Sequence, residues 1–433
     1  MAATRGLAAT VALMAIAMIV PTAIGWDVHV RSFPPLHAEW APRLGAGTVP
    51  ALLLAVLAAR FAVDLAERLA WRWLLAAAFA AGLAWMLSLA FVDGAHGIGD
   101  ILQTPYEYLR TARRVGDVHQ LLQQFVGRID TRSAPLPLWP VHVAGHPPGA
   151  LLVFVGLDRL GLGGGFAAGM VVTAIAATTA VAVLVTVRAL GAEAMARRAA
   201  PFLVFGPAAV WQAVSADAMF AAVAAWGLAA LALAATRRSV ALPIAGGLLL
   251  GAAVMLSYGL PLLGILAVTV LVLGRSWRSL PIAAAAALAV LAAFAALGFS
   301  YLDALPALRA RYLQGVGGRR PATYWTWGSL AALAFSAGPL AGAGLAQLLG
   351  HARARLRDES TRAVAALAAA AAASVLVADA TQMSKAEVER IWLPFVPWIL
   401  LGCALLPERW RRGGLVLQVA VALAVEHLLQ TGW

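Results

Sequence analysis

Long apolar stretches alternate with short arginine-bearing connections along nearly the whole chain. An apolar stretch of about 20 residues is long enough to cross the hydrocarbon core as an α-helix, and a helix satisfies its own backbone polar groups there. The pattern therefore predicts an all-α, polytopic membrane protein with about 13 spans. The predicted spans are residues 7–25, 48–63, 73–92, 166–187, 199–213, 218–235, 241–257, 259–274, 280–299, 325–347, 363–379, 392–406 and 414–431.

Arginine placement predicts the orientation of these spans. Six connections are basic: Arg68 and Arg72; Arg188, Arg197 and Arg198; Arg237 and Arg238; Arg275 and Arg278; residues 351–362; Arg409, Arg411 and Arg412. Because cytoplasmic loops carry an excess of arginine and lysine, all six are placed inside. This predicts a bacterial plasma-membrane protein with a cytoplasmic N-terminus. The long hydrophilic segments 26–47, 93–147, 300–324 and 380–391 then lie on the extracytoplasmic side.

Two stretches need a different interpretation. Residues 148–160 are apolar, but a full crossing there would invert every later arginine connection, so we predict a half-membrane helix. In segment 93–147, Thr104-Pro105-Tyr106-Glu107 predicts an N-cap, a first-turn proline and a capping-box glutamate. Apolar positions at helical spacing on both sides of Gly116 predict two short helices in the membrane interface. No linker divides the chain, so residues 1–433 form one predicted membrane domain.

Composition narrows the class of protein further. The chain is 62% hydrophobic and 12% charged, which excludes an ordinary soluble globular protein. The net charge of +12 is explained by the basic connections, so we expect no nucleic-acid partner. The single cysteine, Cys403, lies in an apolar stretch, which excludes a disulfide framework and a thiolate metal site.

The segment after the first apolar stretch is densely ionisable. Its ionisable residues are Asp27, His29, Arg31, His37 and Glu39. A carboxylate tuned by nearby charges is what general-base catalysis requires, so Asp27 is the first candidate base. His29 and His37 could ligate a divalent cation with Asp27 or Glu39, but their spacing matches no strong metal motif. The alternative to a functional site is that this segment is a solvated loop whose charged residues face water.

The string His142-Val-Ala-Gly-His146-Pro-Pro-Gly is the most distinctive in the chain. Pro147 should hold His146 extended, and the double proline should begin the helix at 148–160. His146 would then stand at a helix N-terminus, where anions are favoured. The alternative is an incidental histidine in a helix-start turn. His142 and Glu107, from the same hydrophilic segment, are candidate substrate contacts.

Two tight turns on the predicted outer side carry further candidates. Asp217, in Ser215-Ala216-Asp217, has two interpretations. It is either a carboxylate that lines one outward-facing cavity together with Asp27, His146 and Arg390, or a simple cap of the following helix. Tyr258, in Ser257-Tyr258-Gly259, is a weaker candidate.

Some basic residues lie on the predicted outer side, against the positive-inside distribution of the other arginines. Arg319 and Arg320 follow Gly317-Gly318, and phosphate recognition is a natural use for such a pair. In the string Ser384-Lys385-Ala386-Glu387-Val388-Glu389-Arg390, Ser384 and Glu387 predict a capping box, and Lys385 and Glu389 predict an i,i+4 pair. Arg390, one turn further in, is a second phosphate-ligand candidate, with Lys385 beside it.

Together these strings resemble the GT-C superfamily of integral-membrane glycosyltransferases, in an actinobacterial-type branch. The strings are His146-Pro-Pro-Gly, Ser215-Ala-Asp, Ser257-Tyr-Gly and Ser384-Lys-Ala-Glu-Val-Glu-Arg-Ile-Trp. The resemblance extends over nearly the whole chain. The chain departs from that family at one point. The family often has two acidic residues as a pair in its first outer loop, whereas here Val28 follows Asp27 and Glu39 comes twelve residues later.

The resemblance implies inverting transfer of a sugar from a polyprenyl-phosphate donor to an extracytoplasmic glycan, lipid or protein. Asp27, or else Asp217 or Glu39, would deprotonate the acceptor, and Arg390 or Arg319–Arg320 would neutralise the departing phosphate. His146 would bind the phosphate or orient the base. A transporter or lipid flippase is one alternative, although the charges fall at span ends rather than at the midplane. A non-catalytic membrane assembly protein is another.

Overall fold

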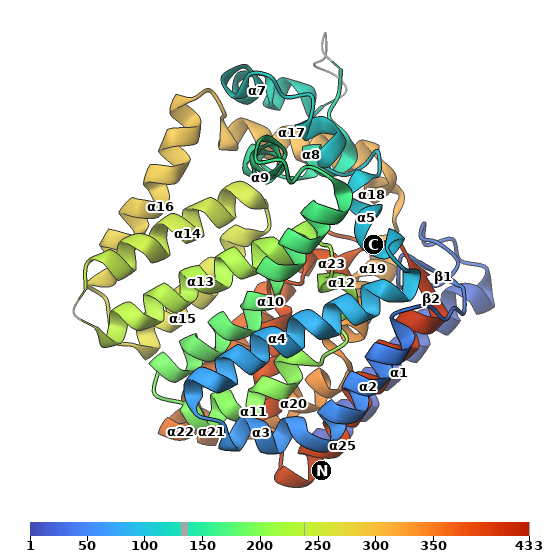
Figure 1. The fold of residues 1–433 in the computed structure, drawn as a ribbon, viewed down its shortest axis with the longest axis vertical. Helices are drawn as coiled ribbons and strands as arrows, with labels where there is room; N and C mark the ends of the chain where they lie inside the picture. The colour runs from blue at the N-terminus through green and yellow to red at the C-terminus, as the bar shows by residue number, and fades with distance from the viewer. Residues whose placement is uncertain (131–136, 238, 433) are drawn as a thin grey trace.

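Helices make up nearly all the regular structure in the computed structural model, which describes residues 1–130, 137–237 and 239–432 (Figure 1). Among the described residues, seven helices are long and apolar enough to cross a membrane: α1 (Ala2–Ile24), α2 to α3 (Thr48–Arg68), α4 with η2 (Trp71–Asp93), α10 (Gly165–Ala189), α13 (Ala216–Thr236), α16 (Ser279–Ala296) and α22 (Glu359–Ala380). The predicted class, an all-α polytopic membrane protein, is confirmed.

Two predicted spans are interrupted at glycine–proline pairs. The stretch 325–347 forms α19 (Ala322–Ala337) and α20 (Pro339–Gly350), which meet at 106°. Gly338 between them has φ of 76°, and Pro339 begins the new helix because its missing N–H needs no partner there. If this bent pair counts as one crossing, the spans number eight.

The second interruption divides the stretch 199–213. Helix α11 (Glu193–Val204) ends before Gly206-Pro207, and a separate turn, α12 (Ala209–Gln212), follows it. Three more apolar helices, of 10–17 residues, are shorter than these seven: α14 (Ala241–Leu256), η6 to α15 (Leu260–Leu273) and α24 to η7 (Val396–Leu405).

The basic connections beside α3, α11 and α22 gather at one end of the helix bundle, at the bottom of Figure 1, whereas α13 and α15 end at the left of that view. Arg197 Nη1 donates hydrogen bonds to the carbonyl oxygens of Ala66 and Leu69. Arg411, the first residue of α25 (Arg411–Leu428), pairs with Glu67 at 2.6 Å. Connections far apart in the sequence thus share one end, as the positive-inside pattern predicts.

The hydrophilic segments and their short helices extend from the top of Figure 1 toward its right side. These are α5 (His96–Gly99), α6 (Leu109–Ala112), α7 (Val118–Gln124), α8 (Val141–Gly145), α9 (Pro148–Arg159), α17 (Tyr301–Gln314), α18 (Val316–Arg319) and α23 (Val388–Ile391). The helix predicted at 148–160 is present as α9. Of the two helices predicted around Gly116, the second is present as α7, whereas the first is reduced to the single turn α6, which begins only at Leu109. Leu109, Leu121 and Leu122 on these helices are buried.

The predicted capping box at Thr104–Glu107 is wrong. Helix α6 begins at Leu109, and residues 104–108 form turns. The Glu107 carboxylate hydrogen-bonds to His142 instead. A buried carboxylate must find a strong partner, and here a distant imidazole rather than a local backbone N–H provides it.

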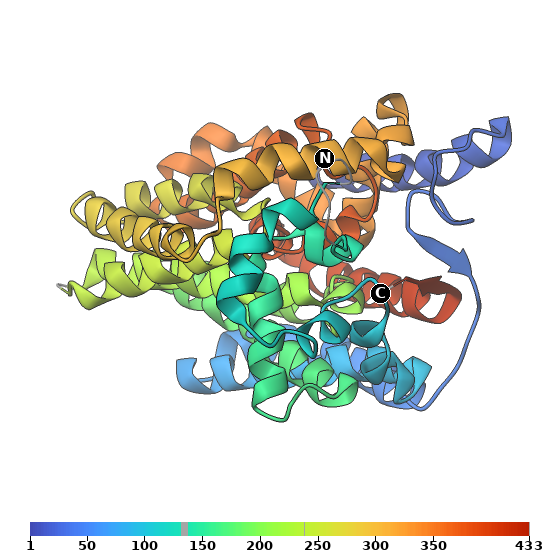
Figure 2. The same ribbon diagram turned by 90° about the horizontal axis from the view of Figure 1, so that it is seen from above.

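A small sheet joins the segment between α1 and α2 to the C-terminal end of the described chain. β1 (Ala38–Trp40) pairs antiparallel with β2 (Leu429–Thr431), with Ala38 opposite Thr431. Arg43 fastens the same region, because it donates to the Glu426 carboxylate at 2.8 Å and to the Leu429 carbonyl oxygen at 2.7 Å. Figure 2 shows that this sheet lies at the edge of the molecule opposite α14 and α16.

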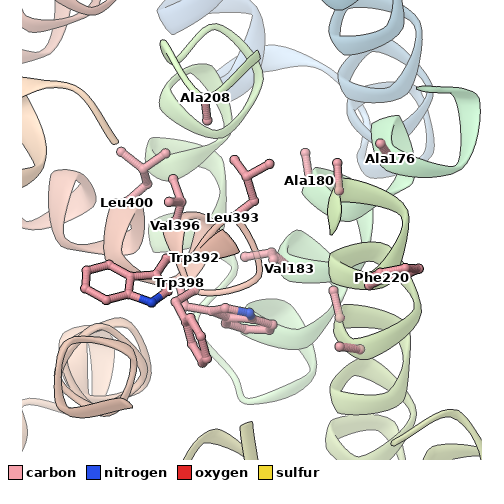
Figure 3. Packing of buried hydrophobic residues seen from close by; sticks show 14 of the residues in the cluster. Ala176, Ala180, Val183, Ala208, Phe220, Trp392, Leu393, Val396, Trp398 and Leu400 are labelled. Carbon is pink, nitrogen blue, oxygen red and sulfur yellow. The ribbon is translucent and has the colours of Figure 1, made fainter. Parts of the chain in front are cut away.

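Tryptophans and small residues pack the centre of the bundle (Figure 3). Trp392 and Trp398 are buried beside α10 and α13, where Ala180 and Phe220 lie. Small side chains on α10 let neighbouring helices approach closely, which is how membrane helices gain dispersion contacts. The segment 388–400 is thereby held against the start of α13.

Candidate functional site

The buried ion pair between Asp217 and Arg390 is the centre of the candidate site. Ser215 caps α13, since its hydroxyl accepts the Ala218 N–H at 3.4 Å. The alternative in which Asp217 is a simple helix cap is therefore wrong, and its carboxylate is available for other contacts. Arg390 Nη1 lies 2.7 Å from Asp217 Oδ2, and the two side chains are only 5% and 3% exposed.

His146 is the second component, and its backbone is as expected. Its φ and ψ of −129° and 154° are extended, and Pro148 begins α9. Nε2 of His146 lies 3.5 Å from Asp217 Oδ1. Nδ1 lies 2.8 Å from the Tyr108 hydroxyl and 2.8 Å from the His142 carbonyl oxygen. Histidine and aspartate from separate hydrophilic turns thus meet.

Tyr108 is a site residue that the sequence reasoning missed. Burial, reinforced by Glu107 and Asp217, holds the pKa of its hydroxyl well above the usual value, so the phenol remains a neutral hydrogen-bond group. Tyr106, the aromatic residue of the predicted capping-box string, is exposed. The local sequence marks Tyr108 only as an aromatic residue with a polar hydroxyl that comes directly before Leu109, which is buried.

Glu107 and His142 form a second acidic–imidazole pair beside the first. Glu107 Oε1 lies 2.6 Å from His142 Nδ1, and both side chains are mostly buried. Within the described residues, Glu107 Oε2 is buried and has no hydrogen-bond partner. We call Glu107, Tyr108, His142, His146, Asp217 and Arg390 the central cluster.

Arg320 and Glu387 form an ion pair that adjoins the central cluster. The predicted capping box at Ser384–Glu387 is wrong, because α23 starts only at Val388. The Glu387 carboxylate instead lies 3.1 Å from Arg320 Nη2 and 3.9 Å from Arg390 Nη2. Burial acts to raise the pKa of Glu387, but Arg320 and Arg390 outweigh it and hold the pKa below its usual value.

The other two basic candidates differ in position, because Lys385 lies beside Arg320 and Arg319 faces outward. The predicted i,i+4 pair of Lys385 and Glu389 is wrong, since residues 385–387 are not helical. The Lys385 ammonium donates instead to the Arg320 carbonyl oxygen at 2.8 Å, while Arg320 Nη1 donates to the Lys385 carbonyl oxygen at 2.7 Å. Burial and the charge of Arg320 lower the pKa of Lys385. Arg319 is exposed.

The first hydrophilic segment reaches the site through its backbone. The His37 N–H donates to Glu389 Oε1 at 3.2 Å, and the His29 carbonyl oxygen accepts from Arg320 Nε at 3.2 Å. Glu389 is 1% exposed, and this burial raises its pKa to about 7. Burial also lowers the pKa of His37. All four long hydrophilic segments therefore contribute to one region.

Asp27 lies apart from the central cluster. Its side chain is 74% exposed, and its carboxylate accepts the His29 N–H at 2.8 Å. It lines an open cavity of about 280 Å³ together with Trp26, Arg31 and Pro34. We expected Asp27, His146, Asp217 and Arg390 to line one cavity; the structure joins the last three directly and places Asp27 in this separate hollow.

The remaining candidates do not join the cluster. Tyr258 packs against Tyr301, with ring centres 5.5 Å apart. Glu39 lies on β1 with Oε1 3.9 Å from Arg31 Nε. The weak metal candidates were His29, His37 and Glu39, and in the described part of the chain no three or more histidine, cysteine or acidic side chains are grouped to hold a metal ion.

The site combines guanidinium groups, imidazoles and carboxylates at one end of an apolar bundle. Such a set can bind an anionic group and move a proton. Comparison with known proteins does not narrow this further, because no protein-family model matches the chain and no curated protein matches its sequence.

Proposed function

We propose that this protein is a membrane glycosyltransferase that moves a sugar from a polyprenyl-phosphate donor to an extracytoplasmic glycan, lipid or protein, with inversion. One observation carries the proposal. Four hydrophilic segments converge on the Asp217–Arg390 pair and His146, at the bundle end opposite the arginine connections. A buried charge cluster at a helix end costs free energy, so a functional role is the default interpretation.

In this proposal Asp27 is the base that deprotonates the acceptor. A base must be reachable, and Asp27 is an exposed carboxylate that lines an open cavity. Asp217 is less suited to that role, since Arg390 holds its carboxylate at 2.7 Å. Asp217 instead positions Arg390 and His146.

Arg320 and Arg390 are the proposed ligands of the donor phosphate. Arg320 lies between the two regions, because it contacts the backbone of His29 on one side and Glu387 on the other. Guanidinium groups stabilise the charge that develops on a departing phosphate. The apolar helices around the cluster would accommodate the polyprenyl chain.

The membrane arrangement that accompanies this function has about 13 crossings, with the N-terminus in the cytoplasm of a bacterium and the site outside. In that arrangement α9 is a half-membrane helix beneath His146. A flippase would place its ionisable groups near the midplane, whereas Asp217 lies in the first turn of α13.

The test uses purified protein in lipid nanodiscs and a panel of polyprenyl-phosphate sugars, with release of polyprenyl phosphate as the readout. Asp27→Asn should lower the rate by about 100-fold or more, in the range for a general base. Asp303→Asn, at an exposed acidic residue of α17, is the matched control and should leave the rate unchanged. Full activity of Asp27→Asn would refute the base assignment. Absence of release with every donor would favour a transport or assembly role.

A further inference from the structure

Tyr108 is held firmly against the helix that follows His146. Its side chain has no exposed surface. Its ring lies parallel to that of Phe154 in α9, with centres 4.8 Å apart and an interplanar angle of 1°. Such stacking fixes the ring plane. The direction of the hydroxyl group relative to His146 is therefore set by α9 itself.

The hydroxyl gives His146 Nδ1 a choice of two partners. One is the His142 carbonyl oxygen at 2.8 Å, which can only accept a hydrogen bond. The other is the Tyr108 hydroxyl at 2.8 Å, which can donate or accept. A protonated Nδ1 can donate to the carbonyl, and a bare Nδ1 can accept from the hydroxyl.

The other ring nitrogen, Nε2, determines which of these two partners suits Nδ1. Nε2 of His146 faces Asp217 Oδ1 at 3.5 Å, and a carboxylate requires a donor opposite it. In a neutral imidazole, only the tautomer with a bare Nδ1 has a proton on Nε2. In that tautomer the bare Nδ1 needs a donor, and of its two contacts only the Tyr108 hydroxyl can donate, because the His142 carbonyl oxygen can only accept. Without the hydroxyl this buried acceptor would be unpaired, which is costly.

We infer that Tyr108 is a positioning residue that holds His146 in the tautomer whose Nε2–H faces Asp217. Sequence reasoning assigns it no role, and it contacts His146 rather than the reacting groups. Its importance for catalysis rests on the proposed function. Its effect on the tautomer does not, because that follows from the three contacts of the His146 imidazole with Tyr108, His142 and Asp217.

The experiment records ring nitrogen NMR signals of ¹⁵N-histidine-labelled protein in nanodiscs, which distinguish protonated from bare ring nitrogens. His146→Gln identifies the His146 signals by their loss. In the wild type, neutral His146 should carry its proton on Nε2. A wild-type His146 that carries a proton on Nδ1, as a neutral or a cationic ring, would overturn the inference without any variant at Tyr108.

Tyr108→Phe then removes only the hydroxyl and keeps the ring that stacks on Phe154. The proton of His146 should move to Nδ1. Tyr312→Phe is the matched control, because it removes another largely buried phenol hydroxyl, which accepts the Lys385 N–H at 2.9 Å. Its His146 signals should match the wild type. An unchanged tautomer in Tyr108→Phe, or the same change in Tyr312→Phe, would refute the inference.

Kinetics separate this inference from the proposed function. If sugar transfer is found, Tyr108→Phe should lower kcat by about tenfold, the equivalent of one net hydrogen bond, with little change in KM. If no variant transfers sugar but the tautomer changes as expected, the proposed function fails and the positioning role stands. If transfer occurs and Tyr108→Phe alters neither kcat nor the tautomer, the positioning role fails alone.

Discussion

Arg390 and Asp217 are 173 residues apart in the sequence, yet Nη1 of one lies 2.7 Å from Oδ2 of the other in a buried ion pair. This contact joins the start of α13 to α23 and so brings the 380–391 segment onto the His146 turn. Each charge compensates the other where water cannot, which makes the pair sensitive to the loss of either partner.

Loss of Arg390 should therefore destabilise the protein strongly. Arg390→Met leaves the Asp217 carboxylate buried without its ion-pair partner, and we expect a cost of about 3–5 kcal/mol. The double variant with Asp217→Asn should recover part of this, because neither charge is then left alone. Thermal unfolding in detergent checks both.

The control for this prediction is Arg412→Ala, which breaks a partly exposed pair with Asp64. Exposed pairs contribute about 0–1 kcal/mol, so its unfolding temperature should change little. An unaltered unfolding temperature for Arg390→Met would show that the buried pair does not stabilise the fold.

Glu389 should make stability depend on pH. Burial raises its pKa from 4.5 to about 7, so the folded protein retains a proton that the unfolded chain loses. Stability from this group is therefore complete below about pH 4.5 and falls as the pH rises to about 7, by about 3 kcal/mol in total.

Glu389→Gln isolates this contribution, since the amide oxygen can still accept the His37 N–H. Relative to the wild type, the variant should gain stability progressively between about pH 4.5 and 7 and keep that gain at higher pH. Unfolding temperatures measured from pH 4 to 8 test this. A constant difference between the two proteins across that range would contradict it.

Two glycines of α9 should respond oppositely to the same change. A Cβ at Gly149 would lie 2.4 Å from the Met255 carbonyl oxygen, whereas one at Gly156 would meet nothing within 4 Å. Gly149→Ala should thus force α9 away from the C-terminal end of α14 and cost about 1–3 kcal/mol.

Gly156→Ala should instead stabilise α9 by about 0.5–1 kcal/mol, because alanine loses less backbone entropy in a helix. Thermal unfolding of the two variants, side by side, decides the matter. Equal effects of both substitutions would argue against close packing at Gly149.

Orientation in the membrane can be tested with single cysteines in a Cys403→Ala background. Asp303 and Arg357 are exposed residues on α17 and α21 (Ala352–Arg357), at opposite ends of the bundle. With arginine connections inside, a membrane-impermeant thiol reagent added to intact cells should label Asp303→Cys and spare Arg357→Cys. The reverse labelling would invert the proposed topology.

Much of the fold could be predicted from the sequence because its signals are local. Apolar stretches long enough to cross a bilayer predicted α1, α10, α13 and α22. Pro147 predicted the extended backbone of His146, since the ring of a proline restricts the residue before it. The double proline predicted the start of α9. Arginine placement predicted that the basic connections share one end.

What only the tertiary structure decided is the partner of each polar side chain. Glu107 and Glu387 matched local capping patterns, but His142 and Arg320 bind them instead, because a buried carboxylate gains more from a charged or imidazole partner than from a cap. Tyr108 gave no pattern at all. The sequence by itself determined where helices form, through local backbone and burial preferences, and long-range packing decided which charges meet.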